Sequence, residues 1–183
     1  MDDIDFKPVY NYFTSNCKHM FQMTDYKLKY KSDILDQFNT IIEHCENGFI
    51  NDWITFKKGY VSIIIIMSIF MKYKYLSTDK MYMYDIKTIY FIEMGFEDYY
   101  KELNIYEKLL IINVYSISNK ISDLLIAKDL LAKCIKTPLV LKYIHKVNKN
   151  IVILTKFNRY PSRNIYLNRL STLDEVDYLD TLL

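Results

Sequence analysis

Apolar residues recur every three to four positions along most of this chain, the spacing of one face of an α-helix. In residues 26–47 this face carries Ile34, Phe38 and Ile42, and Gly48 follows as a C-terminal stop. The same pattern predicts further helices over residues 9–21, through the apolar run 63–66, from 79 to Gly95, after 104, over 121–135 and over 138–154.

Capping residues stand before several of these segments. Residues 51–52 (Asn-Asp) are expected to cap the helix that runs through 63–66. Residues 104–107 and 172–175 have the capping-box pattern, and residues 137–138 (Thr-Pro) read as an N-cap followed by the first helical residue. Residues 158–171 break the periodicity around a proline, so we expect an irregular segment before a short last helix.

The run of four isoleucines at 63–66 has an alternative interpretation as a buried β-strand, because β-branched residues favour sheets. No alternating partner strand is found elsewhere, and three glycines leave few tight hairpins. The sequence therefore predicts an all-α fold, an antiparallel array of about eight helices forming a single domain over residues 1–183.

Neither a membrane span nor a disulfide framework is predicted. The longest apolar stretch, residues 59–71, is shorter than the roughly 20 residues that a transmembrane helix needs. The N-terminus is acidic, unlike a signal peptide. The three cysteines are scattered, which favours free thiols in a reducing compartment. We therefore expect no membrane insertion and a cytoplasmic location.

The composition is biased toward residues with AT-rich codons. The chain has 2 Ala, 3 Gly, 3 Pro and 3 Arg, against 21 Lys, 18 Tyr and 25 Ile. An AT-rich genome explains this bias, and a large DNA virus is the source we expect, with an AT-rich protist or bacterium as the alternatives. A viral protein would act in the host cytoplasm or the virion.

The titratable residues give little support for catalysis or for a metal site. His19, His44 and His145 lie far apart in the sequence. Cys17 with His19, and His44 with Cys45, would make a zinc site only if four ligands converged, but neighbouring residues on a helix point in different directions. We predict no catalytic residues, no metal and no cofactor.

Two segments near the C-terminus resemble the signature of a known family. Residues 157–164 read F-N-R-Y-P-S-R-N and residues 167–175 read L-N-R-L-S-T-L-D-E. They are similar to the F-G-R-F-P-H-R-N and L-G-R-x-S-T-x-E-E segments of domain-of-unknown-function family 924. Matching positions earlier in the chain, in the same order as in the family, are Glu43, Gly48, Asp52, Trp53, Phe70, Asp85, Gly95 and residues 107–110. The resemblance implies an all-α, tetratricopeptide-like fold with no established activity.

The chain departs from the family pattern at several polar positions. Residues 68–73 read S-I-F-M-K-Y where the family has D-Q-F-P-R-N, and residues 114–119 read V-Y-S-I-S-N where it has P-F-M-H-S-E. Ser162 replaces the histidine of F-P-H-R-N. These changes remove most of the acid, amide and imidazole groups, so we do not expect an enzyme.

All three arginines, Arg159, Arg163 and Arg169, fall within one window of 11 residues, in a chain that otherwise uses lysine. A guanidinium offers a planar fork that an ammonium lacks. One interpretation is structural, with the forks tying the irregular segment to carboxylates such as Asp85, Glu43 or those of the last helix. The other is a site for an anion or an acidic peptide.

Positive charge is concentrated in the same third of the chain. Residues 120–169 contain 8 Lys, 3 Arg and 2 Asp, a net charge of +9 in a chain whose overall charge is +2. Lys142, Lys146 and Lys149 fall on one stripe of the predicted helix 138–154, and Lys133, Lys136 and Lys156 extend it. A solvated basic face is the alternative to a binding surface. Tyrosine–lysine runs at 26–31 and 72–75 resemble base-stacking platforms, although half-buried tyrosines are the alternative.

Our functional hypothesis is a non-enzymatic helical scaffold whose basic face, residues 128–169, binds an acidic protein partner, with Arg159 and Arg163 as forked anchors. The first alternative is binding of a small anionic ligand, or a hydrolase-like activity of the family, with Arg163, Asn164 and Asp85 lining the pocket. The second alternative is nucleic-acid binding, against which the small overall charge argues.

Overall fold

The structure, a computed structural model, describes residues 5–22 and 30–182. Its helices are α1 (Lys7–Gln22), α3 (Lys31–Glu46), α4 (Lys57–Ile65), α5 (Met71–Lys74), α6 (Lys80–Tyr99), α7 (Ile105–Ser116), α8 (Ile121–Ala132), α9 (Pro138–Phe157) and α10 (Leu173–Asp180). A π-helical turn, Ile66–Phe70, joins α4 to α5 into one rod, so the described chain forms eight helical rods. The described residues contain no strand, which confirms the all-α prediction.

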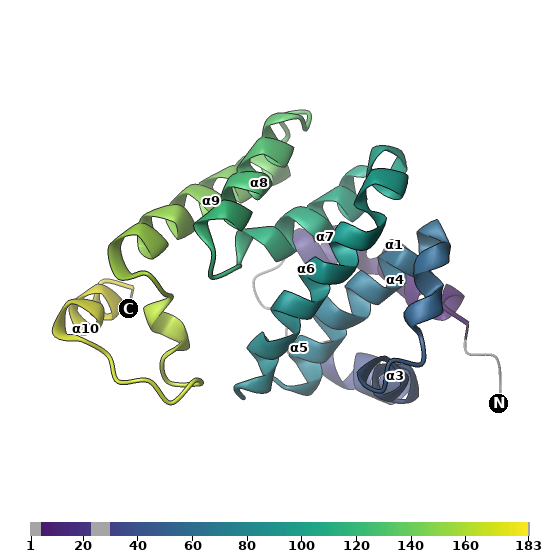
Figure 1. The fold of residues 1–183 in the computed structure, drawn as a ribbon, viewed down its shortest axis with the longest axis horizontal. Coiled ribbons are helices and arrows are strands. Elements are labelled where there is room, and N and C mark those ends of the chain that lie inside the picture. Colours follow the sequence, from purple (N-terminus) through teal and green to yellow (C-terminus); the bar gives the residue numbers. More distant parts are fainter. Residues whose placement is uncertain (1–4, 23–29, 183) are drawn as a thin grey trace.

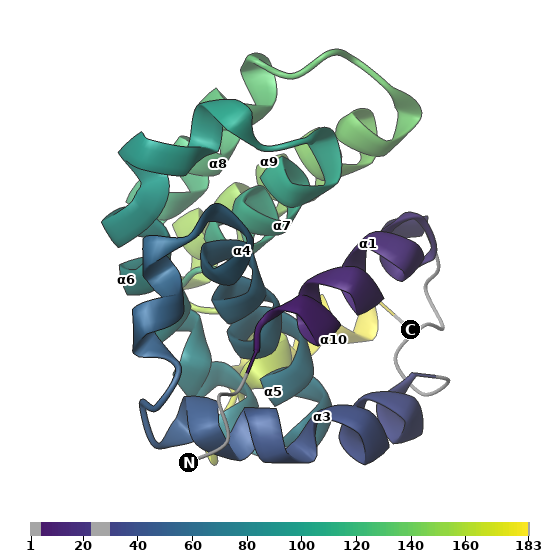
Figure 2. The same ribbon diagram turned by 90° about the vertical axis from the view of Figure 1, so that its right-hand side faces the viewer.

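The helices form one layered array (Figure 1). The α4 rod lies at the centre, in contact with α1, α6 and α7. The α8 and α9 helices pack on each other and on α7, and α10 contacts the 3-10 turn Pro161–Arg163 at the far end (Figures 1 and 2). The predicted start of the second helix at residue 26, most of the 26–31 run and the side chain of His19 lie outside the described residues. No helix in the described part of the chain is long and apolar enough to span a membrane.

The isoleucine run at 63–66 lies in the middle of the hydrophobic core. Every residue from Gly59 to Ile66 is buried, so α4 is apolar on all sides. The hydroxyls of Ser62 in α4 and of Ser68 in the π-helical turn donate hydrogen bonds within the rod: Ser62 to the Lys58 carbonyl at 2.8 Å and Ser68 to the Ile64 carbonyl at 2.6 Å. The run is therefore helical, because neighbouring helices cover it on every side.

Three of the predicted caps are confirmed. Asn104 and Glu107 form a reciprocal capping box at α7, and residues 172–175 form another at α10. Thr137 caps α9, and Pro138 is its first residue. The predicted cap at 51–52 is wrong, because these residues open a 3-10 turn, Asn51–Thr55, and α4 begins only at Lys57.

Two glycines explain where the predicted boundaries fail. The 3-10 turn folds back on α4, since a Cβ at Gly59 would lie 2.2 Å from the carbonyl oxygen of Trp53. Gly95 was expected to end the fourth helix, but α6 continues to Tyr99. A Cβ at Gly95 would lie 2.7 Å from the Tyr60 ring, so this glycine permits close packing of α6 on α4. Gly48, with φ of 78°, does follow the end of α3 as predicted.

Candidate functional site

Arg159 lies just after α9, where Asn158 turns the chain with a left-handed φ of 55°. Its guanidinium donates two hydrogen bonds to the Glu175 carboxylate, from Nε at 2.6 Å and from Nη2 at 2.7 Å. Nη2 also donates to the Leu170 carbonyl at 3.0 Å. This bidentate geometry needs an arginine, because a lysine offers only a point charge. The fork ties the last helix to the end of α9.

The Glu175 carboxylate collects further donors. The Asn164 side-chain amide donates to Oε2 at 3.2 Å, and the Thr172 backbone N–H donates to the same oxygen at 2.9 Å. Hydrogen bonding from Arg159 is the main cause that lowers the pKa of Glu175 to about 2. Asn164 also donates to the Ser171 hydroxyl at 3.0 Å. The Glu175 carboxylate is therefore the acceptor to which the irregular segment is hydrogen-bonded.

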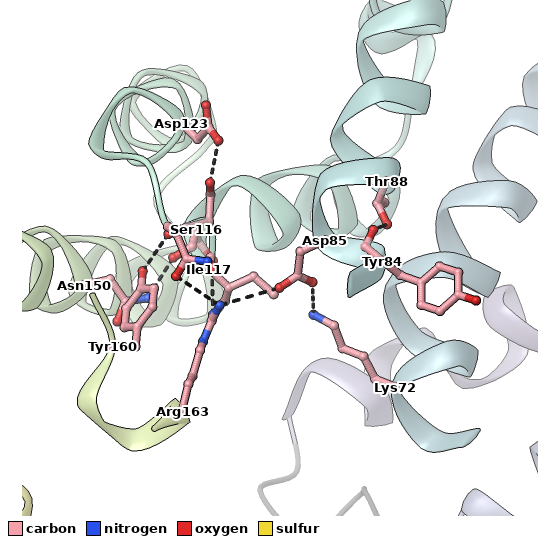
Figure 3. A network of polar contacts seen from close by, with 12 residues as sticks. Lys72, Tyr84, Asp85, Thr88, Ser116, Ile117, Asp123, Asn150, Tyr160 and Arg163 are labelled. Atoms are coloured by element: carbon pink, nitrogen blue, oxygen red, sulfur yellow. Dashed lines mark hydrogen bonds and ion pairs between the residues drawn. The ribbon is translucent and has the colours of Figure 1, made fainter. Parts of the chain in front are cut away.

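Arg163 and Asp85 are both buried and face each other across the gap between the irregular segment and α6 (Figure 3). The strongest contact of Arg163 is with the Ile117 carbonyl, to which Nη2 donates at 2.6 Å. Its Nη1 lies 3.8 Å from Asp85 Oδ2, beyond hydrogen-bond distance. Lys72 is closer, with Nζ 2.8 Å from Asp85 Oδ1. Asp85 is thus held mainly by Lys72.

Two tyrosine rings enclose the Arg163 guanidinium. Its central carbon lies 4.7 Å from the centroid of Tyr82 and 4.3 Å from that of Tyr160, within the range of cation–π contacts. The Tyr160 hydroxyl donates to the Ser118 carbonyl at 3.0 Å. Burial raises the pKa of Tyr160 to about 12, so this hydroxyl keeps its proton. Burial also lowers the pKa of Arg163, opposed by the charge of Asp85.

The arginines therefore do what the structural interpretation describes, with a change of partner. Glu175 in the last helix receives the fork of Arg159, and the Ile117 carbonyl accepts from Arg163, with Asp85 as a more distant ion-pair partner. Glu43 is exposed and accepts a hydrogen bond from Asn39 at 2.7 Å. The third arginine, Arg169, is exposed, and its side chain has no hydrogen bond or ion pair with the described residues.

The predicted lysine stripe divides in the structure. Lys146 turns inward and donates to Asn113 on α7 at 2.7 Å. Lys142 and Lys149 are exposed, and neither makes an ion pair with the described part of the chain. Lys156 continues their row, seven positions further on, with Nζ 4.9 Å from the centroid of the Phe157 ring. An exposed row at i, i+7 and i+14 thus lies along α9.

No carboxylate from the neighbouring sequence offsets this row. Between Asp129 and Asp174 the sequence has no Asp or Glu. Two outward-facing apolar side chains, Leu141 and Val152, lie beside the lysines on the same helix. At its C-terminal end the row reaches a cleft of about 520 Å³, lined by Lys156, Phe157, Asn158, Arg159, Thr172, Asp174 and Glu175.

With this arrangement described, the comparisons with known proteins decide the family. The profile of the family "Bacterial protein of unknown function (DUF924)" matches residues 10–182. The chain belongs to the DUF924 family. It is similar in structure to the protein of unknown function ATU0120 from Agrobacterium tumefaciens, with a TM-score of 0.85, 16% sequence identity, and coverage of 96% of this chain and 97% of that one. At that identity the likeness shows the fold alone. No functionally curated protein matches the chain.

Metal-binding and nucleophilic groups are dispersed in this DUF924 protein. Cys17 and Cys45 are buried and Cys134 is partly buried, all as free thiols. Burial raises the pKa of Cys45 to about 12, which keeps the thiol protonated. His44 is partly buried on α3, with Nδ1 2.7 Å from the Thr40 carbonyl oxygen. Within the described residues no three His, Cys, Asp or Glu side chains gather as metal ligands.

The tyrosine–lysine run at 72–75 is committed to contacts inside the DUF924 fold. Tyr73 is buried, and the Lys74 ammonium lies 2.8 Å from Glu46 Oε2. The Tyr75 hydroxyl donates to the other oxygen of Glu46. Tyr73 is therefore a buried and Tyr75 a partly buried tyrosine of the α3–α5–α6 junction.

Several partners in this site could not be predicted from the sequence. Lys72, Tyr82 and Asn113 come from helices far from the arginine window, and no local pattern marks them as partners of Asp85, Arg163 and Lys146. The Tyr160 ring is the partner that the sequence could have indicated, because it stands in the same segment as Arg163.

Proposed function

We propose that this DUF924 protein is a non-enzymatic helical scaffold that binds an acidic segment of a partner protein along the outer face of α9. The observation that carries the proposal is the row of Lys142, Lys149 and Lys156 together with the absence of Asp and Glu between residues 130 and 173. The neighbouring carboxylates that usually neutralise a helical lysine are missing. A partner's carboxylates would supply that neutralisation.

The spacing of the row defines the occupant. Lysines seven positions apart on a helix lie about 10.5 Å from each other along the axis. A helical partner segment with Glu or Asp every seven residues presents its carboxylates at the same interval. Leu141 and Val152, which are 54% and 66% exposed, lie beside the row and offer apolar contacts to such a segment. An acidic amphipathic helix therefore fits both the lysine row and the two apolar side chains beside it.

Lysines, and not the two arginines of the original hypothesis, are the anchors that we propose. The Arg159 fork is occupied by Glu175 and the Arg163 guanidinium is enclosed by two tyrosines. Taking Arg159 away would remove the two-pronged partner of the Glu175 carboxylate. Taking Arg163 away would leave the Ile117 carbonyl without its side-chain donor, at a cost of about 1–3 kcal/mol. The ammonium groups of Lys142 and Lys149 carry no such cost.

A small anionic ligand fits less well. The cleft next to Lys156 is lined by Asp174 and Glu175 as well as by Arg159, so its charges are mixed. Nucleic acid fits less well too, because the row has only three cations and the chain's net charge is only +2. We place the scaffold in the cytoplasm, that of the host if the source is a virus, with its helix pairs stacked in a tetratricopeptide-like manner.

The experiment compares capture of proteins from an extract of the source cells by three forms of the full chain. These are the wild type, K142E/K149E, and the control K18E/K101E, which makes the same change in charge at exposed lysines on α1 and on the 3-10 turn Tyr100–Glu102. The extract is treated with nuclease, and captured proteins are identified by mass spectrometry.

The expected result is a stoichiometric protein that the wild type and the control retain and K142E/K149E loses. Calorimetric titration of that purified protein should then show an affinity that falls with salt concentration. Equal capture by all three forms would reject the α9 surface. Capture that disappears with nuclease would replace the proposal with nucleic-acid binding.

A further inference from the structure

The helix α6 exposes an apolar stripe on its outer side. Met83, Ile86, Tyr90 and Met94 are 61%, 73%, 60% and 50% exposed, respectively. Their spacing of three to four residues places them on one face, opposite the face that buries Asp85, Thr88, Ile92 and Gly95. In Figure 2 the α6 helix lies at the left-hand edge of the array. Contiguous exposed apolar surface of this kind marks an interaction site.

The charges around the stripe are divided between its two ends. Lys80 and Lys87 lie in the N-terminal half of α6, and their ammonium groups contact the rings of Tyr75 and Tyr84, at 5.2 Å and 5.5 Å from the centroids. Glu97 and Asp98 lie in the last turn, exposed and without an ion-pair partner in the described part of the chain. Exposed Asp79 stands beside Lys80 and exposed Glu93 precedes Met94, so lysines predominate toward the N-terminal end of the surface and carboxylates toward its C-terminal end.

Such a surface is complementary to itself when two copies meet in antiparallel orientation. We infer that α6 binds the α6 helix of a second copy of this chain across a two-fold axis midway between Ile86 and Tyr90. In this pairing Met83 lies opposite the partner's Met94, and Ile86 opposite the partner's Tyr90. Lys80 faces the partner's Asp98, and the symmetry makes the same contact twice.

The charge pattern favours a second copy over the other possible occupants. A helix that lies on a membrane surface combines its apolar face with lysine and arginine on the flanks, whereas this stripe ends in Glu97 and Asp98. An unrelated protein would need the same division of charge in reverse, which a second copy provides automatically. The interface uses α6 and leaves Lys142 and Lys149 on α9 uninvolved, so it is independent of the proposed scaffold function.

Sedimentation velocity of the full chain over a concentration series tests the inference. We expect the wild type to shift from monomer to dimer with rising concentration, and Ile86→Glu to remain monomeric because it buries a carboxylate at the centre of the interface. The control is Leu125→Glu, a similarly exposed apolar residue on α8, which should dimerise like the wild type. Circular dichroism confirms that each variant is folded.

Charge reversal then tests the antiparallel register. Lys80→Asp alone and Asp98→Lys alone should each weaken dimerisation about tenfold, because each converts two attractive pairs to repulsive ones. The double variant should recover most of the loss. A wild type that stays monomeric at the highest attainable concentration, a dimer unaffected by Ile86→Glu, or a double variant that is weaker than either single one would overturn the inference.

Discussion

Replacing Arg163 tests whether this arginine acts as a buried tie between helices. In Arg163→Met the hydrogen bond to the Ile117 carbonyl is lost, and a hydrogen bond from a charged donor contributes about 1.5–3 kcal/mol. The contacts with Tyr82 and Tyr160 add about 0.5–2 kcal/mol each, part of which the methionine side chain retains by packing. We therefore expect a loss of about 3–4 kcal/mol. For a domain of this size that lowers the melting temperature by roughly 10 °C.

Double-mutant cycles separate the two cations around Asp85. Lys72 lies 2.8 Å from one oxygen of Asp85, whereas Arg163 lies 3.8 Å from the other, too far for a hydrogen bond. The coupling between Lys72→Met and Asp85→Asn should be about 1–2 kcal/mol, and that between Arg163→Met and Asp85→Asn below about 1 kcal/mol.

Urea unfolding, followed by circular dichroism and by the fluorescence of the single tryptophan, Trp53, measures these free energies. Trp53 is buried beneath the first turn of α4, so its emission reports loss of the core. Reversed coupling energies, with Arg163 coupled more strongly than Lys72, would refute the assignment of Asp85 to Lys72. A loss below about 1 kcal/mol in Arg163→Met would refute the role of the enclosed guanidinium.

Three other predictions concern single positions. Gly59→Ala should destabilise the fold by about 2–3 kcal/mol in urea unfolding, since its Cβ would meet the Trp53 carbonyl, and the control Gly48→Asn should have a smaller effect. The stability difference between the wild type and Glu175→Gln should be complete above pH 4.5, the ordinary pKa of the carboxyl group, and should shrink as the pH falls toward about 2, the lowered pKa in the fold. Cys45, whose pKa burial raises to about 12, should react with a thiol reagent only on unfolding, while Cys134 reacts in the native protein and Cys134→Ser removes that fast phase.

The helix caps, which depend on residues close together in the sequence, were the features that the sequence predicted best. The capping residues of α7, α9 and α10 act through backbone groups two or three positions away, so their sequence pattern determines them. Gly95 shows the limit of this kind of evidence. From the neighbouring sequence, Gly95 is expected to end a helix. Its neighbour in space is Tyr60, which is 35 positions away in sequence, and the contact with Tyr60 decides the role of this glycine.

The candidate site could be predicted only in part for the same reason. The clustering of arginines was visible in the sequence, and so was the choice between an internal and an external role. The choice between an internal and an external role depends on which carboxylates and carbonyls lie near the arginines in space. Three different helices or their ends bring these acceptors to the arginines, namely Glu175, Asp85 and the Ile117 carbonyl. The exposed stripe on α6 has a helical period that the sequence shows, but exposure can be assigned only when the opposite face is known to be buried.

The arginines and the exposed lysines have different roles in this chain, and this difference determines how the proposed function must be tested. Arg159 and Arg163 satisfy planar or buried acceptors that a lysine would fit poorly, so alanine at either position loosens the C-terminal segment itself. A partner lost from such a variant would report unfolding as readily as a broken contact. Lys142 and Lys149 hold nothing within the described fold, so their reversal changes the surface and leaves the packing intact. Loss of binding in K142E/K149E, with an unchanged melting temperature, therefore speaks for a partner on α9 in a way that no arginine variant can.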